Sequence, residues 1–91
     1  MKIENLFKEN AKKHGIVICG GVEIALVENP SPEHTFYDWY FRVRASGMDK
    51  GGNLWAVFWT VTPSVFSYDD FADWDNPSYA ELITEGYFLD N

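Results

Sequence analysis

The first apolar stripe along the chain has helical spacing. Ile3, Leu6, Phe7, Asn10 and Ala11 follow one another at intervals of three and four residues, so four apolar groups share one face. Lys12 to His14 then suit the negative end of the helix dipole, and Gly15 suits the left-handed position after a last turn. The pattern predicts a short amphipathic helix that packs on a core.

Three further segments favour β-strands. Ile16 to Val27 is rich in β-branched residues and is interrupted by Gly20-Gly21, which indicates either a tight hairpin or a bulge in one long strand. We favour the long bent strand, because four residues make a short hairpin arm. Asn29 to Pro32 predicts a loop.

Phe36 to Ala45 alternates between apolar and polar residues, with Asp38, Tyr40, Arg42 and Arg44 on the wet face. Ser46 to Asn53 predicts a flexible hairpin loop. Leu54 to Thr62 is apolar on both faces, so this strand is expected to be central or to have a second face that meets something else.

The last third of the chain carries helix signals. Ser67 followed by Asp70 resembles a capping box, which predicts a short helical turn through Trp74. A second helix is expected to begin at Asn76 to Ser78 and to end at Gly86. The fold class is therefore α+β, with an N-terminal helix, a three-stranded or four-stranded antiparallel sheet and one or two short C-terminal helices.

Length and cysteine content limit the class of protein. The chain has 91 residues, which predicts a single domain over residues 1–91. A single cysteine, Cys19, excludes an intramolecular disulfide and zinc sites built on paired cysteines. The chain shows neither a signal-peptide pattern nor an apolar run of membrane-spanning length, so the expected location is the cytoplasm and no membrane partner is expected.

Charge is the most uneven property of the sequence. Residues 1–50 carry seven acidic and seven basic side chains, whereas residues 51–91 carry seven acidic ones and no Lys or Arg. The net charge of −7 therefore belongs to the C-terminal segment, and it argues against direct binding of nucleic acid. Aromatic side chains interleave with these carboxylates, and Trp and Tyr are favoured anchors at protein interfaces.

Catalytic and metal sites find little support in the pattern. Cys19 lies in an apolar strand, His14 is explained by the helix dipole, and His34 follows two prolines without a nucleophile nearby. The acidic residues between 69 and 81 do not match an EF-hand in the register that begins at Asp70 or in the one that begins at Asp73, and no phosphate-binding glycine loop is present. We expect no enzyme, no cofactor and no metal.

The element order, the opening stretch Met1 to Leu6 and the acidic-aromatic stretch Asp69 to Asp75 resemble small phage-encoded anti-CRISPR and other DNA-mimic inhibitors. One type II-A anti-CRISPR group has a short N-terminal helix, a three-stranded antiparallel sheet and acidic C-terminal helices. The resemblance implies carboxylates that stand where DNA phosphates would lie on a basic channel.

Three functional hypotheses result, of which a small enzyme or ligand-binding domain is the third and is not the expected one. The first is a stoichiometric inhibitor that occupies a basic, nucleic-acid-binding surface of a target protein. Its predicted partner-binding residues are Asp69, Asp70, Asp73, Trp74, Asp75, Tyr79, Glu81 and Glu85. The second is a non-enzymatic assembly or accessory module that forms a homodimer or larger homo-oligomer through its apolar sheet, at Leu54 to Thr62.

Overall fold

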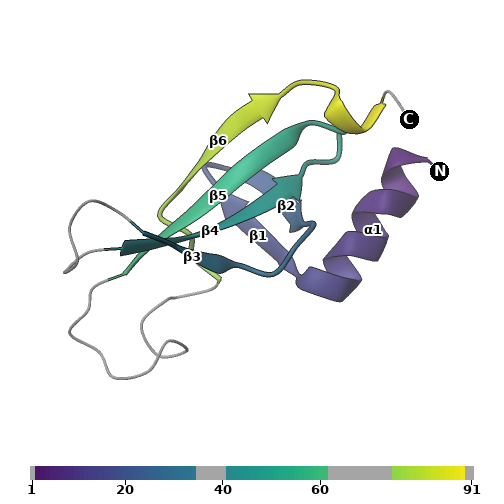
Figure 1. Ribbon diagram of the computed structural model, residues 1–91. Coiled ribbons are helices and arrows are strands. Elements are labelled where there is room, and N and C mark those ends of the chain that lie inside the picture. The colour runs from purple at the N-terminus through teal and green to yellow at the C-terminus, as the bar shows by residue number, and fades with distance from the viewer. Residues whose placement is uncertain (1, 35–40, 62–74, 90–91) are drawn as a thin grey trace.

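A computed structural model describes residues 2–34, 41–61 and 75–89 of the chain. One α-helix and an antiparallel sheet make up this part, so the predicted α+β class is confirmed, but the described sheet has six strands rather than three or four (Figure 1). The elements in chain order are α1 (Ile3–His14), β1 (Ile16–Cys19), β2 (Val22–Leu26), β3 (Ser31–His34), β4 (Phe41–Met48), β5 (Leu54–Val61), β6 (Tyr79–Thr84) and the 3-10 helix η2 (Tyr87–Leu89).

The N-terminal helix forms where its apolar stripe predicts it. Phe7 is the buried residue of α1 and belongs to a core cluster with Ala25 of β2 and Met48 of β4. Ile3 and Leu6 lie against the same cluster from the helix side. The helix ends at Gly15, whose N–H donates to the carbonyl of Ala11 at 2.9 Å. None of the described helices is both long enough and apolar enough to cross a membrane.

The Gly20-Gly21 pair forms a hairpin turn, so the preference for one long bent strand was wrong. The two glycines have φ values of 60° and 81°, and two successive positive φ angles are what a type I′ turn requires. β1 and β2 pair antiparallel on either side of it, from Cys19 opposite Val22 to Ile16 opposite Ala25. The four-residue arm is stabilised because β2 is itself held by other elements.

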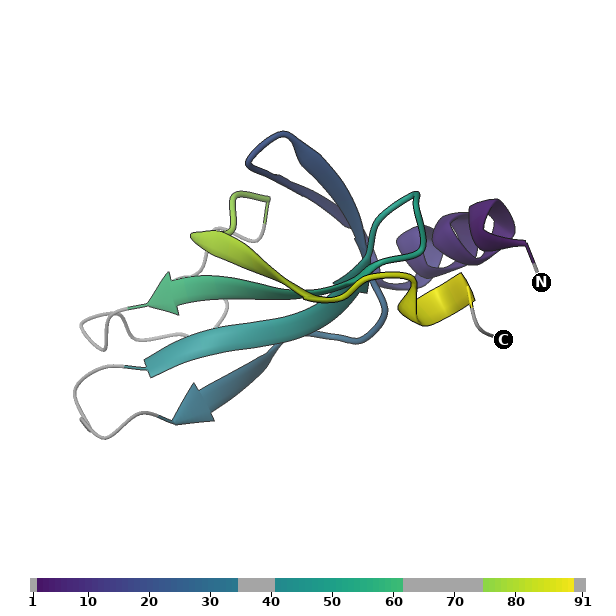
Figure 2. The same cartoon turned by 90° about the horizontal axis from the view of Figure 1, so that it is seen from above.

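Strand β2 is buried on both of its faces. Ile24 and Leu26 face a core formed with residues of β4 and β5, whereas Ala25 faces the α1 cluster. The hairpin meets β4 only near its base, where Ala25 pairs with Met48 and Leu26 with Gly47. From there it splays away from the other strands toward its turn (Figure 2). The main core fills the space between, with Val17, Ile24, Leu26, Val43, Ala45, Val57 and Trp59 buried in it.

Strand β4 has two partners along the same side, and this corrects two predicted loops. Its end near Gly47 pairs with β2, and its beginning, from Phe41 to Arg44, pairs with β3. Ser31 to His34 is therefore a strand that includes Pro32, which an outer strand tolerates because one of its edges needs no N–H donor. Ser46 to Met48 likewise continues β4 instead of opening the loop. The predicted strand residues 36–40 lie outside the described part.

Strand β5 is confirmed over Leu54–Val61 and is internal, as the two-sided apolar pattern indicated. It pairs with β4 on one side and with β6 on the other. Val57 and Trp59 face the main core, while Ala56 and Phe58 are buried on the opposite face.

The helix expected from Asn76–Ser78 to Gly86 was wrong, because Tyr79 to Thr84 forms strand β6. Ser78 does not open a helix: its N–H donates to the carbonyl of Phe58 at 2.8 Å, and pairing continues with Tyr79 opposite Phe58. The edge of β5 supplies backbone partners for this segment, and such long-range pairing overrides a local cap signal. The helical turn predicted between Ser67 and Trp74 lies outside the described residues.

Close approach of β2 to β4 makes Gly47 a sensitive position. A Cβ atom at Gly47 would lie 2.4 Å from Cγ2 of Ile24 and 3.1 Å from the carbonyl oxygen of Ala25. We expect Gly47→Ala to lower the free energy of unfolding by about 1–3 kcal/mol, since the added methyl forces β2 outward. Urea denaturation measures this loss. Gly51→Ala is the matched control, because its Cβ meets only side-chain atoms at 3.3 Å or more, and an equal loss there would contradict the packing argument.

Candidate interaction surface

Four of the eight predicted partner-binding residues belong to the described part of the chain, and they lie in or next to β6. Tyr79 and Glu81 are in the strand, Asp75 precedes it and Glu85 follows it. All four residues are exposed. Asp69, Asp70, Asp73 and Trp74 lie outside the described residues. We define the β6 surface as residues 75–89; β6 itself runs along the upper edge of the sheet in Figure 1.

Tyr79 is fixed to the sheet by its neighbours on β4 and β5. Its ring stacks on Phe58, with ring centroids 4.7 Å apart and an interplanar angle of 20°. Its hydroxyl accepts a hydrogen bond from the Arg42 guanidinium, which also lies 4.3 Å above the Phe58 ring. Tyr79 therefore contributes to the surface as a positioned ring whose hydroxyl already has a partner within the chain.

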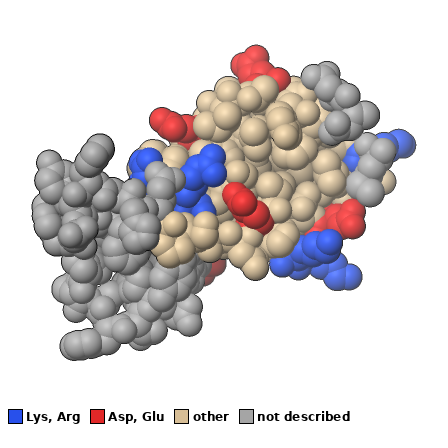
Figure 3. Space-filling model, in the orientation of Figure 1, with Lys and Arg blue, Asp and Glu red and all other residues tan. Residues whose placement is uncertain are grey.

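Arg42 and Arg44 were not predicted as site residues, although the alternation of β4 placed both on its wet face. They are the two arginines of the chain, two residues apart. Arg44 lies 4.0 Å from a carboxylate oxygen of Glu28, and that carboxylate also accepts a hydrogen bond from the Ser46 N–H at 2.7 Å. Figure 3 shows basic side chains over β4 and β5 on this face, with acidic ones beside them and along the β6 edge.

Three carboxylates of the N-terminal half have ion-pair partners among the described residues, whereas those of the β6 surface have none. Lys8 pairs with Glu4, Lys50 with Glu23 and Arg44 with Glu28. Within the described ranges no such ion pair reaches Asp75, Glu81 or Glu85. The sequence asymmetry of charge thus persists in the folded chain, although Arg42 and Arg44 share a sheet face with Glu81.

Apolar side chains are exposed next to these carboxylates. Leu82 pairs with Trp55 and Thr84 with Leu54, so Ile83 is the extra residue of a β-bulge. The exposed fractions of the large apolar residues on this surface are 43% for Leu82, 48% for Ile83, 52% for Tyr87 and 59% for Leu89. The surface therefore combines apolar and acidic groups. Its apolar part was not predicted from the sequence, because a helix would have turned some of these residues inward.

The β4–β5 turn fixes the end of the β6 surface. Asn53 accepts a hydrogen bond from the Gly86 N–H through its side-chain oxygen at 2.8 Å, and the Gly52 carbonyl accepts one from Phe88 N–H at 3.0 Å. Asp49 organises this turn. Its carboxylate accepts hydrogen bonds from the backbone N–H of Gly51, both the backbone N–H and the side-chain amide of Asn53, and the indole N–H of Trp55, at 2.8 to 3.1 Å.

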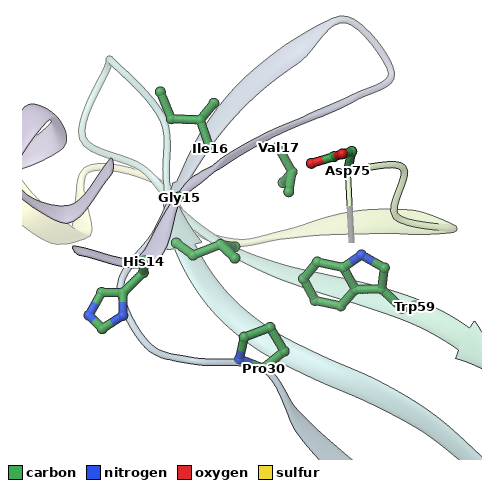
Figure 4. Close-up of a pocket in the computed structure, with 8 residues that line it drawn as sticks. His14, Gly15, Ile16, Val17, Pro30, Trp59 and Asp75 are labelled. Atoms are coloured by element: carbon green, nitrogen blue, oxygen red, sulfur yellow. The ribbon is translucent and has the colours of Figure 1, made fainter. Parts of the chain in front are cut away.

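A cavity of about 230 Å³ opens where the end of α1 meets β1, β2 and β5. Val17, Leu26 and Trp59 form apolar walls, and His14 and Asp75 are its titratable lining residues. Figure 4 shows His14 and Asp75 on opposite sides of the cavity, and Nδ1 of His14 is 3.0 Å from the side-chain oxygen of Asn29. This geometry provides no acid–base pair.

The other side chains considered for catalysis do not join this cavity. Cys19 is half-buried at the end of β1 and is not among the cavity lining. His34 ends β3, and its side chain lies outside the description. Among the described residues, no three His, Cys, Asp or Glu side chains come together as a metal site would require.

Comparison of the chain with protein families, curated proteins and solved structures found no match.

The hydrogen bond from Arg42 to Tyr79 can be tested with a pair of tyrosine variants. We expect Tyr79→Phe to lower the free energy of unfolding by about 0.5–1.5 kcal/mol, because Arg42 loses an acceptor while the ring stack on Phe58 is kept. Tyr87→Phe is the control, since the Tyr87 ring contacts Phe88 edge-on. Equal stability of the Tyr79 variant and the wild type in chemical denaturation would show that the bond contributes nothing.

Asp49 is expected to make stability depend on pH. Partial burial by itself would raise the pKa of Asp49, but the hydrogen bonds from Trp55, Asn53 and Gly51 outweigh it and hold the pKa below its usual 3.8. Because this pKa is lower in the folded than in the unfolded chain, the stabilisation is complete above about 3.8 and is lost as pH falls through the folded value.

The matching variant is Asp49→Asn. At neutral pH we expect it to be less stable than wild type by about 1–2 kcal/mol, since an amide is a weaker and less versatile acceptor than a carboxylate. The difference should narrow when unfolding is followed from pH 7 down to pH below 3.8. Asp75→Asn serves as the exposed control. A difference that stayed constant over the whole pH range would contradict the assignment.

Proposed function

We propose that this protein is a small non-enzymatic binding protein and a stoichiometric inhibitor that occupies a basic, nucleic-acid-binding surface of a target protein. In this proposal it acts as anti-CRISPR and DNA-mimic inhibitors do. The element order that suggested this resemblance differs from the structure, in which Tyr79–Thr84 is a strand and the described sheet has six strands, so the proposal depends on the charge of the C-terminal segment. The observation that supports it is the set of exposed carboxylates on the β6 surface, Asp75, Glu81 and Glu85, which form no ion pair within the described residues.

The support for this proposal comes from the missing counter-charge. In the helix that the sequence predicted, Glu81 and Glu85 would lie one turn apart and repel each other, but Glu81 lies in a strand and Glu85 in the turn after it. The charge imbalance remains, because residues 51–91 contain no Lys or Arg, whereas the acidic side chains of residues 1–50 are matched in number by basic ones. A partner with a basic surface would supply the missing charge, and charge complementarity mainly sets specificity and association rate.

A second candidate function is assembly of the protein with itself through its sheet. Pairing across an interface at β5 is ruled out, because β5 already pairs with β4 and β6 on its two edges. The candidate therefore moves to the outer strands, where Ile16 and Ile18 of β1 and Leu82 and Ile83 of β6 are exposed apolar residues. Light scattering over a range of protein concentrations distinguishes a self-associating chain from a monomer that binds another protein.

The inhibitor proposal predicts a charge-dependent and salt-dependent complex. Immobilised wild-type protein should capture a basic protein from bacterial lysate at low salt and release it at high salt, since exposed charges are screened within about 8 Å at physiological ionic strength. Glu81→Lys should weaken the capture several-fold. The captured protein, once purified, should lose its binding of DNA or RNA when about one equivalent of this protein is added.

Glu9→Lys is the matched control, because Glu9 is an exposed residue of α1 and the substitution changes the net charge by the same amount. It should leave capture unchanged. Capture that resists high salt, equal weakening by Glu9→Lys and Glu81→Lys, or a captured protein that keeps its nucleic-acid binding would each contradict the proposal.

A further inference from the structure

We propose that the outer edge of β6 binds an extended segment of the partner as an additional strand of the sheet, and that this segment alternates basic and apolar side chains. The inference rests on the proposed function and names how the β6 surface would engage its partner. It is argued from the position of β6 in the sheet, the exposure of its side chains and the charges beside it.

Among the residues that the structure describes, one backbone edge of β6 has no neighbouring strand. Strand β6 is the last strand in the order β1-β2-β4-β5-β6, and its described pairing is with β5 alone. In an antiparallel sheet, alternate N–H and C=O groups of an outer strand point away from its neighbour, and these groups can pair with an incoming strand. Figure 1 shows β6 along the upper border of the sheet, and Figure 2 shows η2 beside α1.

Strand β6 has few of the features that commonly keep an outer strand from pairing with another chain. The strand Tyr79–Thr84 contains neither Lys nor Pro. The bulge at Ile83 is the one irregular position, so regular pairing is available from Tyr79 to Leu82. Of the other outer strands, β3 contains Pro32, which lacks an N–H donor. Strand β1 is only four residues long and has no charged side chain that would attract a basic segment.

The two faces of β6 specify the side chains of the incoming strand. Tyr79 and Glu81 share one face, because they lie opposite Phe58 and Ala56, and Leu82 shares the other face with Trp55. Directly opposed residues of neighbouring strands interact most strongly, and unlike charges or paired apolar groups are favourable there. An incoming strand would therefore place Lys or Arg beside Glu81 and apolar residues beside Leu82.

Charge also selects between a basic segment and a second copy of this chain. A second copy has the same net charge of −7 and would bring its own Glu81 and Glu85 to the shared edge. A basic segment would supply the counter-charge that these carboxylates lack, and the same segment would extend the sheet. Strand addition of this kind derives its affinity from main-chain hydrogen bonds and its selectivity from alternate side chains.

The test uses a short synthetic peptide of alternating Lys and Val, and ¹⁵N-labelled full-length protein. A second peptide has the same sequence with alternate backbone nitrogens methylated, which removes donors for strand pairing without changing charge. A third alternates Glu and Val. We expect the Lys–Val peptide to shift the amide resonances of Tyr79 to Leu82 and to slow their hydrogen exchange. Methylation should weaken binding about tenfold or more, which corresponds to the loss of one to three hydrogen bonds.

The possible outcomes separate this inference from the proposed function. If both Lys–Val peptides bind equally well and Glu81→Lys weakens both, strand addition is overturned while a basic partner for the acidic surface stands. If the Glu–Val peptide binds as well as the Lys–Val peptide, the basic partner is overturned as well. If β6 amides become protected in the protein alone as its concentration rises, a second copy is the occupant and the inference is wrong. Absence of any shift at Tyr79 to Leu82 with the Lys–Val peptide also overturns it.

Discussion

The backbone of β2 passes directly against β4 at Gly47, and most of the described fold depends on that contact. A side chain at Gly47 would collide with Ile24, whose own side chain is fully buried in the main core. Because the strands meet so closely there, the β1–β2 hairpin can turn across the sheet and cover Val57 and Trp59 of β5. The opposite face of β2 then receives α1, with Phe7 against Ala25. One close contact thus places a helix, a hairpin and the central strands around two connected clusters of buried residues.

Strand β5 extends this order to the C-terminal segment. Its apolar residues occupy both faces, and its edge beyond β4 offers backbone partners to Tyr79–Thr84. The β4–β5 turn then fixes the residues after β6, since Asn53 and Gly52 accept hydrogen bonds from Gly86 and Phe88. The acidic and apolar side chains of the β6 surface are therefore held in place by the hydrogen bonds of β6 to β5 and by those of the following turn to the β4–β5 turn. Groups held in this way lose less conformational freedom on binding than groups on a loop, which favours a recognition role.

In the folded chain the charges are not divided as simply as in the sequence, where one half is neutral and the other is acidic. Arg42 and Arg44 belong to the neutral half, yet they lie on the sheet face that Tyr79 shares, and Arg42 donates to its hydroxyl. The acidic character is thereby concentrated at the β6 edge rather than spread over the whole sheet face. This arrangement supports the proposal of a binding surface with two components, exposed apolar side chains and carboxylates without a partner in the described part of the chain.

Local patterns determined α1 and β5, because helical spacing at Ile3, Leu6 and Phe7 and the two-sided apolar run from Leu54 specify which faces must be buried. Charge asymmetry is likewise a property of the sequence. At Gly20-Gly21 the sequence left a hairpin turn and a bulge open, and only the folded chain decided for the turn. Tertiary structure alone decided that Tyr79–Thr84 is a strand and that Ser31–His34 joins the sheet. Both segments carry turn or cap signals at their ends, and these signals describe only neighbouring residues. The edge of β5 pairs with residues 21 to 30 positions away, and the edge of β4 pairs with residues 7 to 13 positions away. This pairing is stronger than a local preference worth about 1 kcal/mol.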